Sequence, residues 1–449
     1  MPRSSPRAAD AGGGVSLAAA ALALVAPLAL TLAPLAPLAP ARADARLARE
    51  PVSASHAAQR GARVVRVALS AAPQREATLS AVGGEWRLYD AGGRTMLARG
   101  LAGRAYRVES AGGARLRAVR DDGLETPARD GPFLARPIGG DALVTWNGHR
   151  YRGDLLVVAT DSGLLVVNQL GVEDYLRGVV PLEIGNRPPE ERAAAEAQAV
   201  AARSYVSVRA RGESGRDFDV VAGVGDQVYG GADAERASSD AAVRATAGEV
   251  LTYAGRVVSA PFHAVCGGST AEPPEVWRST GEPFLRRVSD RIPGTDRYYC
   301  DASPRFHWTE SWTGASLDAT LERYLRRYAA VGGGGVGRVR FVRVATTTPS
   351  GRVGTLAIDT DRGSYTLRGN DIRFVLRRSS GEILSSTYFS VEPTIGRDGR
   401  LAALSLRGTG YGHGIGMCQW GAIGRARAGQ DYRRILQTYY PGTTIARVD

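Results

Sequence analysis

The chain has 449 residues with 57 basic and 45 acidic side chains, which gives a formal net charge of +12. Every basic side chain is arginine, and the absence of lysine excludes Schiff-base lysine chemistry, serine–lysine dyads and P-loop phosphate binding. The arginines are scattered and are not interleaved with aromatic residues, so we expect no nucleic-acid partner. The positive charge suits an anionic wall polymer, peptide carboxylates or a membrane surface. Genome composition is the simpler explanation of the exclusive use of arginine.

The first 43 residues are typical of a secretory signal peptide. Arg3 and Arg7 precede an apolar stretch over residues 15–38, and Ala41-Arg42-Ala43 has the small-x-small form of a signal-peptidase site. Four prolines between residues 27 and 40 disfavour one continuous helix, and an uncleaved membrane anchor is the alternative. We therefore expect a secreted, extracytoplasmic protein of the cell envelope, with a linker over residues 44–62 and no membrane segment beyond the signal.

Residues 63–169 predict a β-rich N-terminal part. Short β-runs alternate with glycine pairs, and turns are expected at Asn147-Gly148 and at Asp161-Ser162-Gly163. The pattern then changes, because residues 172–180 have helical spacing and residues 181–186 form a break that contains a proline. Pro188-Pro189-Glu190-Glu191 begins an alanine-rich helix that extends to about residue 210.

The rest of the chain predicts turns and strands with a few helices. Residues 214–310 show turns and short strands and complete a core over residues 170–310 that includes the alanine-rich helix. Residues 311–407 read as an inserted α+β subdomain, with an amphipathic helix over 316–330 and strands over 339–391. Residues 408–449 are expected to form a glycine-rich loop, two short helices and a strand that complete the core. The predicted fold class is α+β, a mainly antiparallel β scaffold with inserted helices.

Glu183 is the first candidate for chemistry. It lies in the nearly apolar segment 179–185, which we interpret as a loop before the alanine-rich helix. Desolvation in such a segment would raise the pKa of the carboxyl group and let it hold a proton near neutral pH, as a general acid requires. A helix cap or a salt-bridge partner is the alternative for a single loop glutamate.

The alanine-rich helix carries polar residues on two faces. Gln198 and Tyr205 share one face and would meet a polar substrate, whereas Arg203 lies on another face with Glu196 and would pair with a carboxylate. Surface solvation together with a Glu196–Arg203 contact is the alternative.

A second candidate is the glycine-rich stretch over residues 408–422. Glycine at alternate positions lets the backbone approach a ligand closely. The stretch also contains side chains that suit a sugar, namely Tyr411, His413, Gln419 and Trp420. Its spacing is not that of a dinucleotide-binding loop, and a tight turn entering a helix is the alternative.

The cysteines allow two interpretations. In an exported protein we expect Cys266 and Cys300 to form a disulfide. The alternative is a zinc site with His263, Cys266 and Cys300, which needs a fourth ligand that the spacing does not supply. Cys418 remains as the odd thiol, and its order and surroundings do not fit a papain-like nucleophile paired with His413.

Several motifs resemble the sporulation stage II protein D (SpoIID) family, also called the LytB-type amidase-enhancer family. The resemblance extends from about residue 63 to the C-terminus, with the motifs in the family's order. The matching stretches are residues 167–183, 197–205, 226–230, 262–268 with 276–277, 413–422 and 439–443.

The resemblance implies a SpoIID-like fold and a lytic transglycosylase that cleaves peptidoglycan between N-acetylmuramic acid and N-acetylglucosamine. The family's catalytic glutamate falls on Glu183. This chain departs from the family at Ile184, where methionine is usual, and at Cys418, where serine is frequent. Both changes conserve size and leave the glutamate assignment intact. Some relatives hold zinc through histidine and cysteine near the His263 segment, so zinc is the one cofactor that stays open.

These arguments define the predicted site and its alternatives. We predict that substrate is bound by residues of the glycine-rich stretch, with two helix residues supporting Glu183: Tyr411, His413, Gln419 and Trp420, and Gln198 and Arg203. Expected partners are peptidoglycan glycan strands and a cell-wall amidase. A non-catalytic glycan-binding enhancer of an N-acetylmuramoyl-L-alanine amidase is the alternative function, and a secreted structural or carbohydrate-binding module is a third.

Overall fold

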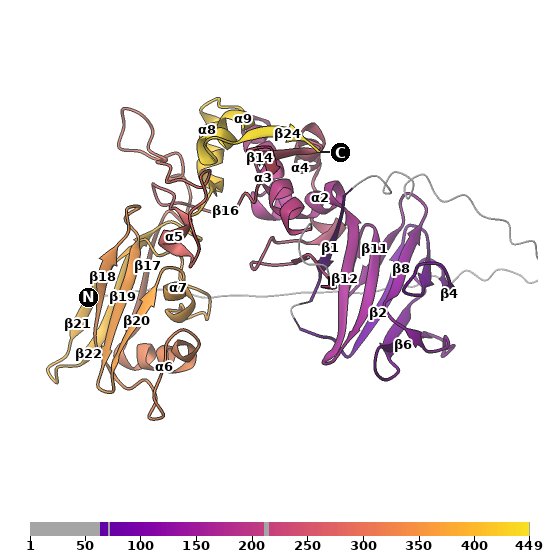
Figure 1. The fold of residues 1–449 in the computed structure, drawn as a ribbon, viewed down its shortest axis with the longest axis horizontal. Coiled ribbons are helices and arrows are strands. Elements are labelled where there is room, and N and C mark those ends of the chain that lie inside the picture. Colours follow the sequence, from indigo (N-terminus) through magenta and orange to yellow (C-terminus); the bar gives the residue numbers. More distant parts are fainter. Residues whose placement is uncertain (1–62, 71, 211–214, 449) are drawn as a thin grey trace, which may run out of the picture. The chain divides into compact units, whose positions relative to one another are not determined.

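The computed structural model describes residues 63–70, 72–210 and 215–448 (Figure 1). The predicted signal peptide over residues 1–43 and the linker over residues 44–62 lie outside the described residues. Within these ranges we find no helix with the length and apolar character that a membrane crossing requires.

The N-terminal part forms two sheets whose buried side chains belong to one hydrophobic cluster. Neighbouring strands pair antiparallel except β1 and β13, which are parallel. In spatial order, the first sheet contains β13 (Val220–Val221), β1 (Val64–Ala68), β12 (Gly163–Gly171), β11 (Asp154–Thr160), β8 (Phe133–Ile138), β3 (Glu85–Tyr89) and β4 (Met96–Gly100). The second contains β10 (His149–Tyr151), β9 (Leu143–Trp146), β2 (Glu76–Val82), β5 (Tyr106–Ser110), β6 (Arg115–Arg120) and β7 (Arg129–Asp130).

Both hairpin turns predicted from the sequence are confirmed. Strands β9 and β10 pair across Asn147 and Gly148, whose φ angles of 50° and 77° are the positive values that this tight turn requires. Strands β11 and β12 pair continuously from Asp154 and Gln169 to the Thr160–Gly163 end. Buried positions alternate with exposed or half-buried ones along β2 and β3, as expected for sheets with one face on the core.

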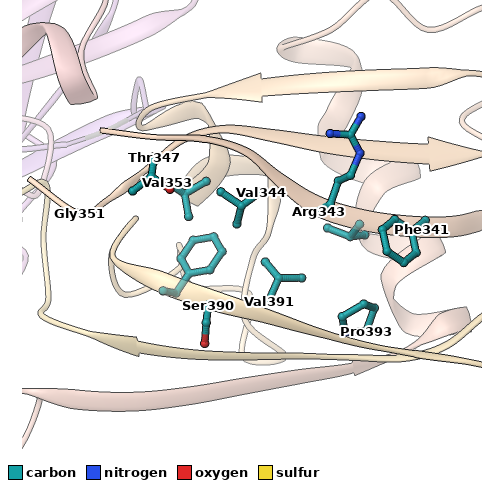
Figure 2. Close-up of a pocket in the computed structure, with 11 residues that line it drawn as sticks. Phe341, Arg343, Val344, Thr347, Gly351, Val353, Ser390, Val391 and Pro393 are labelled. Atoms are coloured by element: carbon teal, nitrogen blue, oxygen red, sulfur yellow. The ribbon is translucent and has the colours of Figure 1, made fainter. Parts of the chain in front are cut away.

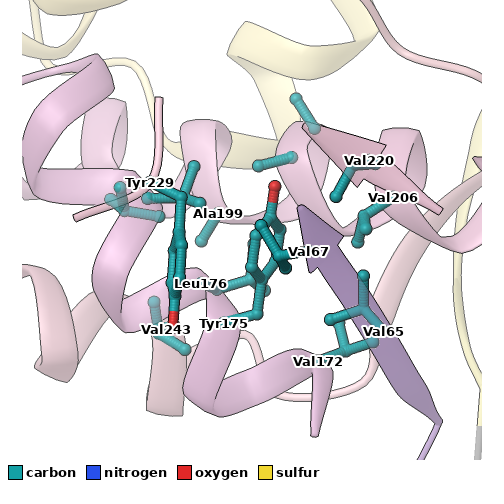
Figure 3. Close-up of a cluster of buried hydrophobic side chains, with 14 of the residues drawn as sticks. Val65, Val67, Val172, Tyr175, Leu176, Ala199, Val206, Val220, Tyr229 and Val243 are labelled. Atoms are coloured by element: carbon teal, nitrogen blue, oxygen red, sulfur yellow. The ribbon is translucent and has the colours of Figure 1, made fainter. Parts of the chain in front are cut away.

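A group of helices packs next to the first sheet. Val65 and Val67 of β1 lie against Val172, Tyr175 and other apolar residues of helix α2 (Figure 3). The group contains α2 (Val172–Glu183), the 3₁₀ turns η1 (Pro189–Glu191) and η2 (Gly231–Ala234), α3 (Arg192–Arg209), α4 (Ala237–Ala245), α8 (Gln419–Arg427) and α9 (Tyr432–Tyr439). Helix α3 contacts α2, α4, α8 and α9 and also β14 (Glu249–Tyr253). Its many buried alanines allow this close packing on several sides.

Helix α3 and the two C-terminal helices confirm the predictions for those segments. Helix α4 was not predicted, since residues 214–310 were assigned only turns and short strands. Strand β14 pairs with β15 (Arg256–Val257) and with the C-terminal strand β24 (Thr444–Arg447). The short strands β16 (Phe262–His263) and β23 (Met417–Cys418) are parallel, which brings the His263 segment beside the glycine-rich stretch.

A second hydrophobic cluster lies between Trp312 and Leu406. It is built from two three-stranded antiparallel sheets and short helices. One sheet contains β17 (His307–Thr313), β22 (Leu401–Thr409) and β21 (Phe389–Ile395), and the other contains β18 (Val339–Thr347), β19 (Val353–Thr360) and β20 (Ser364–Arg368). The helical elements are α6 (Gly314–Tyr324), η3 (Leu325–Arg327) and α7 (Asp371–Val375), while α5 (Pro273–Val276) precedes them in the chain. The mixed composition with mostly antiparallel sheets agrees with the predicted α+β class.

Candidate functional site

Glu183 is the last residue of helix α2 and does not lie in a loop. The predicted break over residues 181–186 begins only after Glu183, because Pro181 lies in the last turn of the helix and removes only one of its hydrogen bonds. Residues 184–188 are not helical, so the later part of the predicted break is confirmed. The helix ends beyond Glu183, where Gly185 adopts a φ of 78° that favours glycine. The carboxylate is therefore positioned by a packed helix, which holds it more rigidly than a loop would.

The Glu183 carboxylate receives one hydrogen bond on each oxygen from segments far away in the chain. The Val228 backbone N–H donates to Oε1 at 2.8 Å, and the Gln419 side-chain amide donates to Oε2 at 3.3 Å. Among the described residues no arginine forms a salt bridge with this carboxylate. Burial raises the pKa of Glu183, while the Val228 and Gln419 hydrogen bonds oppose that increase. The group thus has the environment of a carboxyl that takes up and releases a proton.

The two glutamines predicted for the site are brought together. The same Gln419 amide group also donates to the Gln198 side-chain oxygen at 3.3 Å. Both glutamines are buried, and the Gln198 nitrogen has no hydrogen-bond partner among the described residues. Gln198 therefore supports Glu183 indirectly, through Gln419.

The segment that supplies the Val228 N–H is fixed by hydrogen bonds on both sides. Gln227 accepts a hydrogen bond from the Tyr175 hydroxyl at 2.9 Å, and the Tyr229 hydroxyl donates to Asn168 at 2.6 Å. A side chain at Gly178 of α2 would overlap the Tyr229 ring, so glycine permits this close approach. We did not predict a role for the Val228 N–H, because a backbone donor leaves no residue-type signal in the sequence.

His413 lies in a ring cluster with His263 and Trp277, whose ring centroids are 5.5 and 5.1 Å from that of His413. The Ile415 N–H donates to His413 Nδ1 at 3.1 Å, so the other ring nitrogen carries hydrogen and donates to the Phe262 carbonyl at 2.9 Å. Burial, with the nearby Arg373 guanidinium, lowers the pKa of His413 to about 3. A neutral ring with both nitrogens engaged has no free nitrogen to offer a substrate.

Arg203 does not support Glu183, which corrects our prediction. It pairs with Glu173 at 2.8 Å and donates to the Glu249 carbonyl, and only 1% of its surface is exposed. The alternative contact, between Arg203 and Glu196, is not formed either, because Glu196 pairs with Arg192. The charge of Arg203 belongs to the interior of the helix group.

The remaining predicted binding residues are placed as follows. Tyr205 donates to Asp226 at 2.6 Å, in the segment that supplies Val228. Tyr411 is covered by the Arg305 guanidinium, 4.4 Å from its ring centre. Trp420 is partly buried against the main hydrophobic cluster. Within the glycine-rich stretch, Gln419 is thus the residue that hydrogen-bonds to Glu183.

The predicted Cys266–Cys300 disulfide is not formed, because the two sulfur atoms lie 3.4 Å apart as free thiols. They share a buried site with Cys418 and Asp290, and the four ligand atoms lie within 4.8 Å of one another. His263 lies outside this group and contacts the Ile415 carbonyl at 3.2 Å, so the zinc set with His263 is corrected as well. Asp290 was missed, since an isolated aspartate in a loop carries no ligand-spacing signal.

Glu183 does not line any of three cavities found among the described residues. One of about 390 Å³ lies between strands β18 and β21 (Figure 2). Its lining is mostly apolar, with Arg343 as the charged residue and no carboxylate. It therefore lacks the acid–base group that bond cleavage would need.

Comparison with known proteins gives two family matches. The family described as "Stage II sporulation protein" (SpoIID) matches residues 160–253, which include Glu183, Gln198 and Val228. A domain of unknown function, DUF8618, matches residues 292–416.

Three curated relatives are similar over larger parts of the chain. An uncharacterized protein of Brachyspira hyodysenteriae is 32% identical over 302 residues, which are 67% of this chain and 73% of the relative. The "Amidase enhancer" of Bacillus subtilis is 30% identical, covering 60% of this chain and 40% of the relative. The "Stage II sporulation protein D" of the same organism is 30% identical, covering 46% and 51%. The match thus spans about half or less of each Bacillus subtilis relative.

Proposed function

This chain belongs to the SpoIID family, and from that premise we propose that it is a secreted peptidoglycan lytic transglycosylase with Glu183 as its acid and base. The family and the amidase-enhancer relative support a function at the cell wall. The specific reaction is our proposal.

The observation that carries the proposal is the environment of Glu183. The carboxyl group is partly buried, has no described salt-bridge partner, and is held by hydrogen bonds from Val228 and Gln419. Its pKa is raised by burial, which keeps the protonated form available closer to neutral pH. A structural glutamate would be expected to pair with a cation, as Glu173 does with Arg203.

The proposed mechanism uses one carboxyl group in two steps. Protonated Glu183 donates its proton to the glycosidic oxygen as the bond to the muramic acid C1 breaks. The carboxylate then accepts the proton of the muramic acid C6 hydroxyl, whose oxygen attacks C1 and closes a 1,6-anhydro ring. Ordinary hydrolysis needs a second carboxylate to act on water or on the sugar. Intramolecular attack replaces that group, because a well-positioned hydroxyl reacts with high effective molarity.

The test is digestion of purified cell wall, with and without its stem peptides, followed by mass spectrometry of the soluble products. We expect the wild type to release products that end in 1,6-anhydro-N-acetylmuramic acid. The Glu183→Gln variant should lose at least about a hundredfold in rate, the lower end of the range for general acid–base catalysis. Glu190→Gln is the matched control, because it removes the same charge from an exposed position nearby.

Absence of anhydro products from the wild type on both substrates would reject the transglycosylase. Release of reducing ends without the anhydro ring would indicate hydrolysis instead. An equal loss of rate in Glu183→Gln and Glu190→Gln would show that the rate depends on negative charge alone and not on the position of Glu183.

A non-catalytic role is the second candidate, and the similarity to a protein named "Amidase enhancer" favours it. In that case the protein binds wall glycan and stimulates a separate amidase. The Glu183→Gln variant would then stimulate the amidase as well as the wild type does, in the same digestion with a purified N-acetylmuramoyl-L-alanine amidase added.

A further inference from the structure

We propose that Cys266, Asp290, Cys300 and Cys418 bind one zinc ion that fixes the segment carrying Gln419. The four residues come from three separate parts of the chain, and each has 0% of its surface exposed. Their ligand atoms lie within 4.8 Å of one another. This site goes beyond the proposed reaction at Glu183 and does not depend on it.

The distances suit a four-coordinate ion after a small expansion. A tetrahedral zinc ion with Zn–S bonds of about 2.3 Å separates its sulfur ligands by about 3.8 Å. The Cys266 sulfur lies 3.4 Å from the Cys300 sulfur and 3.2 Å from Asp290 Oδ2. Shifts of a few tenths of an ångström would admit the ion. A disulfide would engage two of the three sulfurs and leave the third thiol beside Asp290 unexplained.

The choice of zinc follows from the ligand set. Thiolates favour zinc, copper(I) or iron–sulfur clusters over magnesium and calcium. A single buried carboxylate beside three thiolates closes a tetrahedral site, which is the usual form of structural zinc.

Hydrogen bonds around the cluster orient Cys418 and Asp290, as second-shell groups do at metal sites. The Cys418 sulfur accepts from the Cys266 and Gly421 N–H groups, both at 3.2 Å. These donors stabilise thiolates, the form in which cysteine binds metal.

Asp290 is oriented in the same way. Its Oδ1 accepts from Arg425 at 3.0 Å and from the Tyr439 hydroxyl at 2.6 Å, which leaves Oδ2 directed at the thiols. A side chain on Gly421 would overlap both Asp290 and Tyr439, so this glycine is needed for the arrangement.

Buried positive charge lies next to the four ligands. A divalent ion with three thiolates and one carboxylate has a net charge of 2 − 4 = −2. Two buried arginines supply +2, namely Arg425, which pairs with Asp290, and Arg352, which is 1% exposed. Arg352 donates to the carbonyls of Cys266 and Ser269, and its Nη1 has no hydrogen-bond partner among the described residues. A buried cation of this kind requires a compensating negative charge.

The site would act on the candidate catalytic centre through the chain itself. Cys418 caps helix α8, and the next residue, Gln419, donates to Glu183. An ion that holds Cys418 to Cys266 and Cys300 therefore holds the Gln419 amide in place. Gln419 is a positioning residue in this arrangement, and the ion takes no part in bond cleavage.

The test is the metal content of the full secreted chain, purified without chelators and measured by elemental mass spectrometry. We expect one zinc per chain in the wild type and in His263→Gln, and close to none in Cys300→Ser and Cys418→Ser. Cobalt(II) exchanged into the site should show thiolate-to-cobalt charge-transfer absorption. Zinc lost from His263→Gln but kept by both cysteine variants would overturn the assignment.

Because buried substitutions also perturb folding, the wild type supplies a second measurement. Chelation should release the ion, lower Tm, and leave three thiols that react with an alkylating reagent after denaturation. Two outcomes would overturn the proposal. If the chain binds no zinc on reconstitution, the site holds free thiols. If the intact mass under non-reducing conditions is lower by two hydrogens, the site holds a disulfide.

Discussion

Two carboxylates lie on either side of the start of helix α8, and they are held in opposite ways. Asp290 is fully enclosed and pairs with Arg425 and Tyr439, beside three thiols. Glu183 is only partly buried and receives hydrogen bonds from a backbone N–H and an amide, with no described salt bridge. A carboxylate with a counter-charge and no access to solvent stabilises structure. A carboxylate that has access to solvent and no counter-charge is free to exchange a proton.

The two groups are linked by adjacent residues of one segment. Cys418 faces the Asp290 group, while Gln419 faces Glu183. Two consecutive residues at the beginning of α8 thus make different contacts. Cys418 contacts the buried Asp290 group, and Gln419 contacts the candidate catalytic carboxylate. Changes on the Asp290 side should alter stability most, and changes on the Glu183 side should alter rate most.

The largest effect is expected from Asp290→Ala. It leaves the buried Arg425 guanidinium without its carboxylate, which typically costs about 3–5 kcal/mol in the free energy of unfolding. Glu183→Ala should cost much less, because no buried cation loses its partner. Urea unfolding of both variants measures this difference. If Glu183→Ala destabilises the protein as much as Asp290→Ala, the contrast between the two carboxylates is incorrect.

An intermediate effect is expected from Gln419→Leu. Loss of the amide should lower the rate on cell wall about tenfold, or about 1.4 kcal/mol. It also removes a donor that favours the charged form of Glu183, so the pKa of Glu183 should rise further. The alkaline limb of the pH–rate profile should then move to higher pH. Gln437→Leu, on the exposed side of α9, should leave both rate and profile unchanged. A slower Gln419→Leu enzyme with an unshifted profile would point to general loss of structure.

The smallest effect concerns stability against pH. Because burial raises the pKa of Glu183 in the folded state, the folded protein binds more protons there than the unfolded chain does. The contribution of Glu183 to wild-type stability therefore falls as pH rises from the unfolded carboxyl pKa of about 4.3 through the raised folded value. Glu183→Gln lacks this loss, so its stability relative to the wild type should increase across that window and be constant above it. Thermal unfolding at a series of pH values measures the difference, and a constant offset at every pH would contradict the raised pKa.

Local sequence patterns predicted several elements well. The Asn147-Gly148 hairpin and the alanine-rich helix were both identifiable, because turn chemistry and helix-start signals act over a few residues. The break predicted over residues 181–186 begins later, at Ile184, since packing of α2 against β1 and α3 outweighs the one hydrogen bond lost at Pro181. Helix α4 was missed because it is short and weakly apolar. The predicted limits of the inserted subdomain, residues 311–407, remain a prediction.

The sequence by itself determined the identity of the chemical groups: an all-arginine charge, one glutamate in an apolar segment, and three cysteines. Only the tertiary structure decided which of them meet. It brought Gln419 to Glu183 across 236 positions of the chain and turned Arg203 away toward Glu173. It also gathered Cys418 and Asp290 with the two other cysteines. Local spacing cannot specify such contacts, because they depend on how helices and sheets pack over long separations in the chain.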